Sequence, residues 1–250
     1  MNLHEFLIVC PLVFLAGFVD AIAGGGGLIS LPAYMFAGIP VHHAIATNKL
    51  SSATGTAVST WHLVKSKCVD IFLVPGTVAC AFVGSIAGAN LALIISDKVL
   101  KTVLVFVLPV VAFCVLRDKD LKPVIPEGFT RKKQYLIMAA CSFVIGIYDG
   151  FYGPGTGTFL IIAFTVFAHL NIQTANAQAK VINLTTNLTA LAIFLYNGQG
   201  VLSLGLASAA CNMLGGYIGA GLVMKNGSKI ARPSIVFVLF LLALKALGVY

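Results

Sequence analysis

Charged residues are scarce in this sequence. Only 10% of its 250 residues are Asp, Glu, Lys or Arg, whereas a soluble domain usually carries about 25%. Hydrophobic residues make up 59%, and the mean hydropathy is +0.98. So few polar side chains cannot cover a surface that faces water, which excludes a soluble domain. The composition predicts an all-α polytopic membrane protein, embedded in the lipid bilayer as one transmembrane domain over residues 1–250.

Several chemical signatures are also absent. The six cysteines form no C-x-x-C pair, and no His or carboxylate spacing predicts a metal site. The sequence has no serine-nucleophile motif and no phosphate-binding Walker motif, and it shows no basic face with interleaved aromatic residues. We therefore expect no metal, no cofactor, no nucleic-acid partner and no ATP-driven transport by this chain alone.

Long apolar runs dominate what is present. Eight of them are long enough to cross about 30 Å of hydrocarbon. Two further apolar pieces, at 28–39 and 158–169, have about 12 residues each and are too short for an upright crossing. Each follows a glycine-rich break, so we predict short broken or re-entrant helices there. The eight predicted spans are 3–23, 41–64, 71–95, 99–116, 135–152, 174–196, 201–224 and 234–250.

The two glycine-rich breaks have a common pattern. The segments from Gly17 to Gly27 and from Gly146 to Thr156 both fit G-x-x-D-x-x-x-G-x-G-x, at a constant offset of 129 residues. Beyond the breaks the offset becomes 131, so that Lys49 matches Lys180. This predicts an internal duplication, with repeat one at 1–116, a basic cytoplasmic linker at 117–133 and repeat two at 134–250. The matched pairs Gly84-x-x-x-Gly88 and Gly215-x-x-x-Gly219 predict close helix contacts.

The loop cations favour an inverted arrangement of the two repeats. Lys and Arg gather in cytoplasmic loops, and the linker at 117–133 holds six of them. If each half crosses the membrane five times, eleven loop cations lie inside and two outside. If each half crosses four times, the repeats are parallel and the count is eight against five. We therefore predict inverted repeats with both chain termini outside.

Asp20 and Asp149 are candidate coupling groups. An ionisable residue inside a membrane segment costs about 2.5–3.5 kcal/mol on insertion scales and is a functional candidate by default. The functional interpretation is a carboxylate that couples protons or gates the path of a solute. In the structural alternative, each carboxylate accepts hydrogen bonds from the neighbouring glycine-rich turn, or lies at the level of the lipid headgroups.

The breaks themselves are candidate binding elements. Gly24, Gly25, Gly26 and Gly27, and in the second half Gly153 and Gly155, leave backbone N–H groups unpaired where a short helix begins. The positive end of a helix dipole and free N–H groups suit an anion, and broken membrane helices use them to bind substrates. The alternative is a tight turn at the surface that needs glycine for positive φ.

Lys49 and Lys180 are candidate anion ligands. If their helices begin near Val41 and Thr174, the two lysines lie about 12 Å and about 9 Å along them. Both would then approach the middle of the membrane, with the hydrogen-bonding side chains of Asn48 and Gln178 beside them. The alternative is a lysine whose long side chain reaches back to the headgroups.

At these residues the sequence resembles the TauE/SafE family, also known as the toluene sulfonate uptake permease family. The resemblance rests on the segment from Gly17 to Leu28, on Pro32, on Ala46-Thr47-Asn48-Lys49-Leu50 and on the second copy from Gly146 to Gly157. It implies a multi-pass transporter of the cytoplasmic membrane, with small sulfur-containing or organic anions as solutes. The second half departs from strict symmetry at Pro154, Thr156 and Gln178.

We therefore predict a secondary transporter for a small anion such as sulfite or a sulfonate, driven by the proton gradient. The lysines and the glycine breaks would bind the anion, and the two Asp residues would couple protons. Two alternatives stay open at this point. One is a membrane-embedded enzyme that acts on an anionic lipid headgroup, and the other is a passive anion channel.

Overall fold

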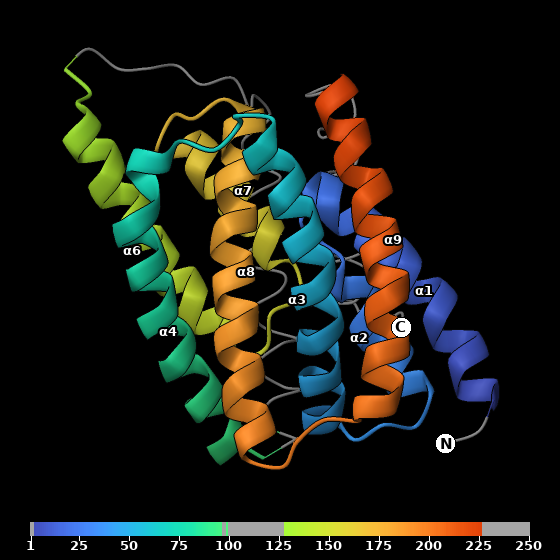
Figure 1. Cartoon of the computed structure of the whole chain (residues 1–250). Coiled ribbons are helices and arrows are strands. Elements are labelled where there is room, and N and C mark those ends of the chain that lie inside the picture. The colour runs from blue at the N-terminus through green and yellow to red at the C-terminus, as the bar shows by residue number, and fades with distance from the viewer. Residues whose placement is uncertain (1–2, 97–98, 100–127, 227–250) are drawn as a thin grey trace.

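The computed structural model of the chain describes residues 3–96, 99 and 128–226 (Figure 1). These residues form eight α-helices, one short 3-10 helix and no strand, which confirms the all-α class. The predicted spans at 100–116 and 234–250, and linker residues 117–127, lie outside the described residues. The elements are α1 (Leu3–Ala23), α2 (Gly27–Phe36), α3 (Val41–Lys65), η1 (Ile71–Leu73), α4 (Val74–Ile94), α6 (Arg131–Phe151), α7 (Thr156–Val166), α8 (Ile172–Tyr196) and α9 (Leu202–Asn226).

Helix length separates two kinds of element. Five described segments are long and apolar enough to cross a membrane: α1, α4 with the preceding η1, α6, α8 and α9. Helix α3 has 25 residues, as many as α8, but its many polar side chains keep it out of that apolar group. At 1.5 Å per residue it still extends over about 37 Å. Helices α2 and α7 have 10 and 11 residues, so each reaches only about half of the hydrocarbon thickness.

Matched helices run in opposite directions in Figure 1. Helix α3 rises from the lower to the upper end of the bundle, whereas α8 descends; α4 descends, whereas α9 rises. Helix α1 begins at the lower end and α6 at the upper end. The packing is matched as well, because α4 lies along α6 and α9 lies along α1. Each of these two pairs joins one helix from the first half of the chain to one from the second half.

Small residues allow these two helix pairs to approach closely. Gly84 and Gly88 of α4 lie directly against carbonyl oxygens of α6, so that a Cβ at either position would overlap them. Gly215 and Gly219 of α9 lie in the same way against carbonyl oxygens of α1. The close contacts predicted from the glycine spacing are therefore present in both halves.

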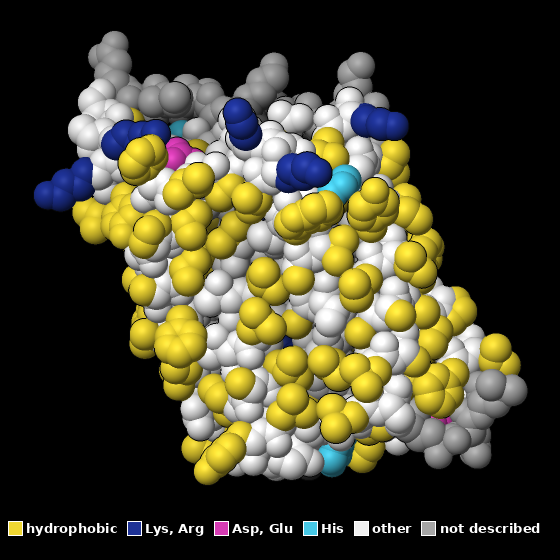
Figure 2. All heavy atoms as spheres, viewed as in Figure 1, with side chains coloured by type: hydrophobic (Ala, Val, Ile, Leu, Met, Phe, Trp, Pro, Cys, Tyr) yellow, Lys and Arg dark blue, Asp and Glu magenta, His cyan; other side chains and the backbone are white. Residues whose placement is uncertain are grey.

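The exposed cations of the described residues lie at one end of the bundle. They come from the end of α3 and the loop after it, from the start of α6 and from the end of α9, and Figure 2 shows them along the upper edge of the molecule. The flanks below that edge carry mainly apolar side chains in this view. The cations are Lys65, Lys67, Arg131, Lys132, Lys133 and Lys225.

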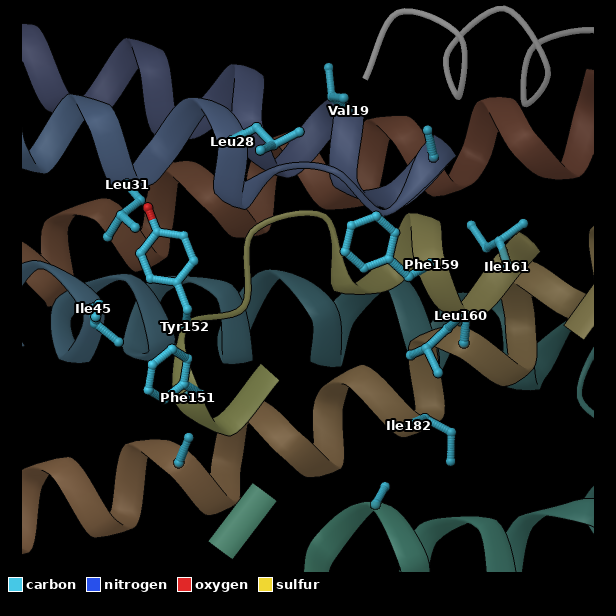
Figure 3. Close-up of a cluster of buried hydrophobic side chains, with 14 of the residues drawn as sticks. Val19, Leu28, Leu31, Ile45, Phe151, Tyr152, Phe159, Leu160, Ile161 and Ile182 are labelled. Carbon is cyan, nitrogen blue, oxygen red and sulfur yellow. The ribbon is translucent and has the colours of Figure 1, made fainter. Parts of the chain in front are cut away.

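The two breaks lie inside the apolar core. Phe151 and Tyr152, just before the second break, are buried, and so are Leu28 and Leu31 of α2 (Figure 3). Gly24, Gly25 and Gly26 of the first break are themselves buried. These three glycines are therefore covered by the protein itself and do not form a turn on its exposed surface.

Candidate functional site

The two breaks cross each other at the centre of the bundle. Gly24 has φ +78°, and Gly153 and Gly155 have φ +97° and +83°, a region that glycine adopts without strain. The backbone N–H of Thr158 donates to the carbonyl of Gly24 at 3.2 Å, and the Thr158 hydroxyl donates to the carbonyl of Ala23 at 2.6 Å. The chain therefore brings the starts of α2 and α7 to one crossing point.

A buried ion pair lies on one side of this crossing. Lys49 of α3 reaches Asp149 of α6, with Nζ 2.8 Å from Oδ2, and the side chains are only 1% and 2% exposed. The other carboxylate oxygen, Oδ1, accepts a 2.6 Å hydrogen bond from the hydroxyl of Thr156, in the first turn of α7. The same hydroxyl lies 2.7 Å from the carbonyl oxygen of Gly153.

A second ion pair lies on the other side. Lys180 of α8 reaches Asp20 of α1, with Nζ 2.6 Å from Oδ2, and Lys180 also donates to the backbone carbonyl of Asp20. Oδ1 of Asp20 accepts from the backbone N–H of Gly26, the N-cap residue of α2, at 3.3 Å. Lys180 is fully buried, but the side chain of Asp20 is 16% exposed.

The two pairs are reciprocal, because each lysine binds the aspartate of the opposite half of the chain. Taking one charge out of water costs several kcal/mol, and removing one partner of a buried pair leaves the other charge uncompensated. Two cations and two anions sum to zero here, so the closed site is neutral. Each lysine lies 8 residues from the first residue of a 25-residue helix, but the two helices start at opposite ends of the bundle.

The start of α8 differs from the prediction in a way that affects the depth of Lys180. Helix α3 begins at Val41 as expected, but α8 begins at Ile172 rather than at Thr174. Asn171 explains the earlier start, because its side chain accepts a hydrogen bond from the backbone N–H of Thr174 at 2.9 Å and so caps the helix. Lys180 therefore lies about 12 Å along α8 rather than about 9 Å.

A small cavity lies between the two ion pairs. Its volume is about 10 Å³, which is near the lower limit for one water molecule. An anion therefore has no room here until the elements around the cavity move apart. Polar groups and glycines from both halves of the chain line it: Asp20, Gly24, Gly27, Asn48, Lys49, Ser52, Asp149, Gly153, Gly157, Asn183 and Asn187.

The predicted site residues other than Gln178 divide into three groups. Asp20, Asp149, Lys49, Asn48 and the glycines at 24, 27 and 153 line the cavity. Lys180 and Gly26 stand just behind it, bound to the Asp20 carboxylate. Gly25 and Gly155 belong to the buried turns without lining the cavity.

Gln178 lies elsewhere. Its amide donates to the carbonyl of Asp70 at 2.7 Å, at the start of η1. Thr47, at the matching position of the first half, accepts from the backbone N–H of Val201 at 3.0 Å, just before α9. Each of these side chains therefore fastens the loop that precedes a long helix of the opposite half of the chain, and neither lines the cavity.

Several groups at the site were not among the predicted site residues. The hydroxyl of Thr156 holds Asp149, and Asn183 and Asn187 line the cavity while bonded to each other at 3.1 Å. The reciprocal pairing was also missed. Its signal was present, because two Lys and two Asp residues at matched membrane positions need partners of opposite charge.

The described residues contain no group of three or more His, Cys, Asp or Glu side chains placed to hold a metal ion. The chemistry that this site offers is therefore that of amines, carboxylates, amides and helix N-termini. A helix N-terminus and a lysine both favour an anion.

Comparison with known proteins finds one family and several relatives that are described as membrane transporters or exporters. The family model described as "Sulfite exporter TauE/SafE" matches residues 9–246. The "Probable membrane transporter protein YfcA" of Escherichia coli (strain K12) is 35% identical over 238 residues, which cover 93% of this chain and 86% of the relative.

Two further relatives are similar over nearly the whole chain. A "Probable membrane transporter protein" of Haemophilus influenzae is 34% identical over 93% of this chain and 90% of its own length. The "Probable membrane transporter protein ORF9" of a Sinorhizobium species is 34% identical over 99% of this chain and 93% of its own length. No solved structure matches the chain.

Proposed function

We infer that this chain, which belongs to the sulfite exporter TauE/SafE family, is a secondary transporter for a small anion coupled to the proton gradient. The chain is a multi-pass membrane protein of a transporter family, and its role is transport rather than catalysis. The observation that carries the proposal is the pair of reciprocal Lys–Asp contacts at the crossing of the two breaks.

An anion is the solute that best fits the lysines and the short helices. Helices α2 and α7 both begin at the crossing, so the positive ends of two helix dipoles meet there beside two buried ammonium groups. In the closed state the carboxylates of Asp20 and Asp149 neutralise these groups. A transported anion would take the place of a carboxylate. The family description makes sulfite the first solute to test, and sulfonates follow as related organic anions.

We further propose that the chain is one transmembrane domain of two inverted repeats, with α2 and α7 as re-entrant half-helices. The opposite directions of α3 and α8, the matched pairs α1–α9 and α4–α6, and the equal depth of the two lysines in their helices support this arrangement. Inverted repeats that meet at a central site can open it alternately to each side of the membrane.

The distribution of charge supports an orientation. The six exposed cations at one end of the bundle mark that end as cytoplasmic under the positive-inside rule. The first described residues of α1 then lie on the outer side. The proposed location is the inner, cytoplasmic membrane, where a proton gradient is available to a secondary transporter.

Uptake into proteoliposomes that contain the purified full-length protein tests this function. The panel consists of sulfite, thiosulfate, short carboxylates and toluenesulfonate, with the uncharged toluenesulfonamide as the matched control for charge. We expect saturable uptake of at least one anion, accumulation above the external concentration under a proton gradient, and no more uptake of the sulfonamide than into empty liposomes.

Two other results would contradict the proposal. If no anion enters faster than into empty liposomes, transport of small anions is refuted. If the anion enters but its internal concentration never exceeds the external concentration under a proton gradient, the protein is instead a passive channel.

A further inference from the structure

The carboxylate of Asp20 already occupies the position of a bound anion. Oδ2 lies 2.6 Å from Nζ of Lys180, and Oδ1 accepts a hydrogen bond from the backbone N–H of Gly26 at the start of α2. One ammonium group and one helix N-terminus are the two partners that a small oxyanion would use. In the closed protein, this aspartate therefore acts as an internal substitute for the solute.

The charges around Asp20 balance. Lys180 of α8 contacts it directly, and Lys49 of α3 and Asp149 of α6 face it across the cavity. Helices α2 and α7 carry no Asp, Glu, Lys, Arg or His, and the only such residue of α9 is Lys225, near its final turn at the cytoplasmic end. An anion that entered without a proton would leave one uncompensated negative charge in a closed site, which is strongly unfavourable.

The two aspartates are not equally free to be replaced. Asp149 is 2% exposed and is held by both Lys49 and the hydroxyl of Thr156. Asp20 is 16% exposed, and the residue that matches Thr156 in its half is Gly27, which has no side chain to bind it. Asp20 is therefore the carboxylate that a proton reaches more easily and that can be displaced at lower cost.

We propose that Asp20 is the proton-coupling carboxylate, and that one proton moves with each singly charged anion so that transport is electroneutral. A proton binds the Asp20 carboxylate, the ion pair with Lys180 opens, and an oxygen of the anion accepts from Lys180 Nζ in its place. On release, the anion leaves, the carboxyl group gives up its proton and the pair closes again. No covalent bond other than the O–H bond forms or breaks. This proposal rests on the proposed anion transport, but it could fail independently.

Uptake by the wild-type protein tests the charge balance, with the anion that the solute panel identifies. With the membrane potential clamped to zero by valinomycin and K⁺, a gradient of one pH unit, acidic outside, should drive about tenfold accumulation of a singly charged anion. With pH equal on both sides, imposing a potential of about 59 mV of either sign should leave the distribution unchanged. An electrogenic carrier of one net charge would shift it about tenfold, and that result would overturn the proposal.

The variant Asp20→Asn tests whether the Asp20 carboxylate is the group that couples protons to transport. We expect it to lose all accumulation driven by pH, and its exchange of labelled for unlabelled anion should no longer vary with pH. Asp70→Asn makes the same chemical change outside the cavity and should keep the wild-type pH response. If Asp20→Asn still accumulates the anion under a pH gradient, Asp20 is not the coupling group. Absence of any anion flux in the wild-type protein would instead refute the underlying transport function.

Discussion

The two ion pairs at the centre of this molecule have the same chemistry but different surroundings. Lys49 and Asp149 are almost completely buried, and a threonine hydroxyl holds the carboxylate in addition. Lys180 is as deeply buried, but its partner Asp20 keeps 16% of its side chain exposed and has a backbone N–H as its second ligand. This difference is the basis of the proposed division of labour, in which one pair fastens the halves together and the other exchanges its carboxylate.

A single departure from symmetry accounts for much of this difference. Thr156 matches Gly27 in the first half, so only the second half has a side chain at the start of its short helix that can bind the carboxylate. The surroundings of the two carboxylates therefore differ at one matched position, Thr156 against Gly27.

Loss of the Asp149 carboxylate should lower the free energy of unfolding more than any of the other substitutions. Asp149→Asn would leave Lys49 buried without a counter-charge, and breaking such a pair costs about 3–5 kcal/mol. Asp20→Asn should destabilise less, because Lys180 also donates to the backbone carbonyl of residue 20, and the substitution keeps that contact. Chemical unfolding of both variants in the same detergent measures the difference. Equal losses, or a larger loss at Asp20, would contradict the division of labour.

The crossing of the breaks should be the next most sensitive feature. Gly24→Ala would place a Cβ on the backbone of Gly157 and Thr158. Gly38 has nearly the same φ, +82° against +78°, but nothing lies within 4 Å of a Cβ there. Both variants should lose about 1–2 kcal/mol because of the left-handed backbone. Only Gly24→Ala should lose a further 1–3 kcal/mol or so through overpacking.

Thermal unfolding and anion uptake of these two alanine variants measure that difference. Gly38→Ala should keep its transport rate, whereas Gly24→Ala should lose it along with the contact between the breaks. If the two variants behave alike, close contact at the crossing does not matter for function.

The smallest expected effect comes from removing the Thr156 hydroxyl, which binds Asp149 and has no counterpart beside Asp20. Thr156→Ala removes one hydrogen bond to a carboxylate, a change of about 1.5–3 kcal/mol, and Asp149 should then respond to protons more like Asp20. The pH profile of anion exchange should broaden, and Thr156→Ser, which retains the hydroxyl, should restore the wild-type profile. An unchanged profile in Thr156→Ala would mean that this hydrogen bond does not set the difference between the two halves.

Much of the described fold was predictable from hydropathy and glycine positions. The long helices lie within a few residues of the apolar runs, and the glycine spacings of α4 and α9 identified two close helix contacts. The start of α8 was missed by two residues, because the prediction did not use Asn171 as a helix cap.

The site was only partly predictable. The residue types at Asp20, Lys49, Asp149 and Lys180 were visible in the sequence, because charges are so rare in membrane segments. Their pairing could not be predicted, because it depends on how the two halves of the chain pack together. The contact of Gln178 could not be predicted for the same reason, since its partner Asp70 is 108 residues away in the chain. The pattern of side chains within one half of the chain does not predict contacts with the other half.

The most direct test of the central claim is anion exchange by a variant that loses one whole ion pair. Asp20→Ala combined with Lys180→Ala removes both charges, so no buried charge is left unpaired and the fold should survive. If Lys180 binds the anion, exchange of labelled anion across proteoliposome membranes should fall to the level of empty liposomes while the unfolding temperature stays near that of the wild type. Exchange at the wild-type rate would contradict the account.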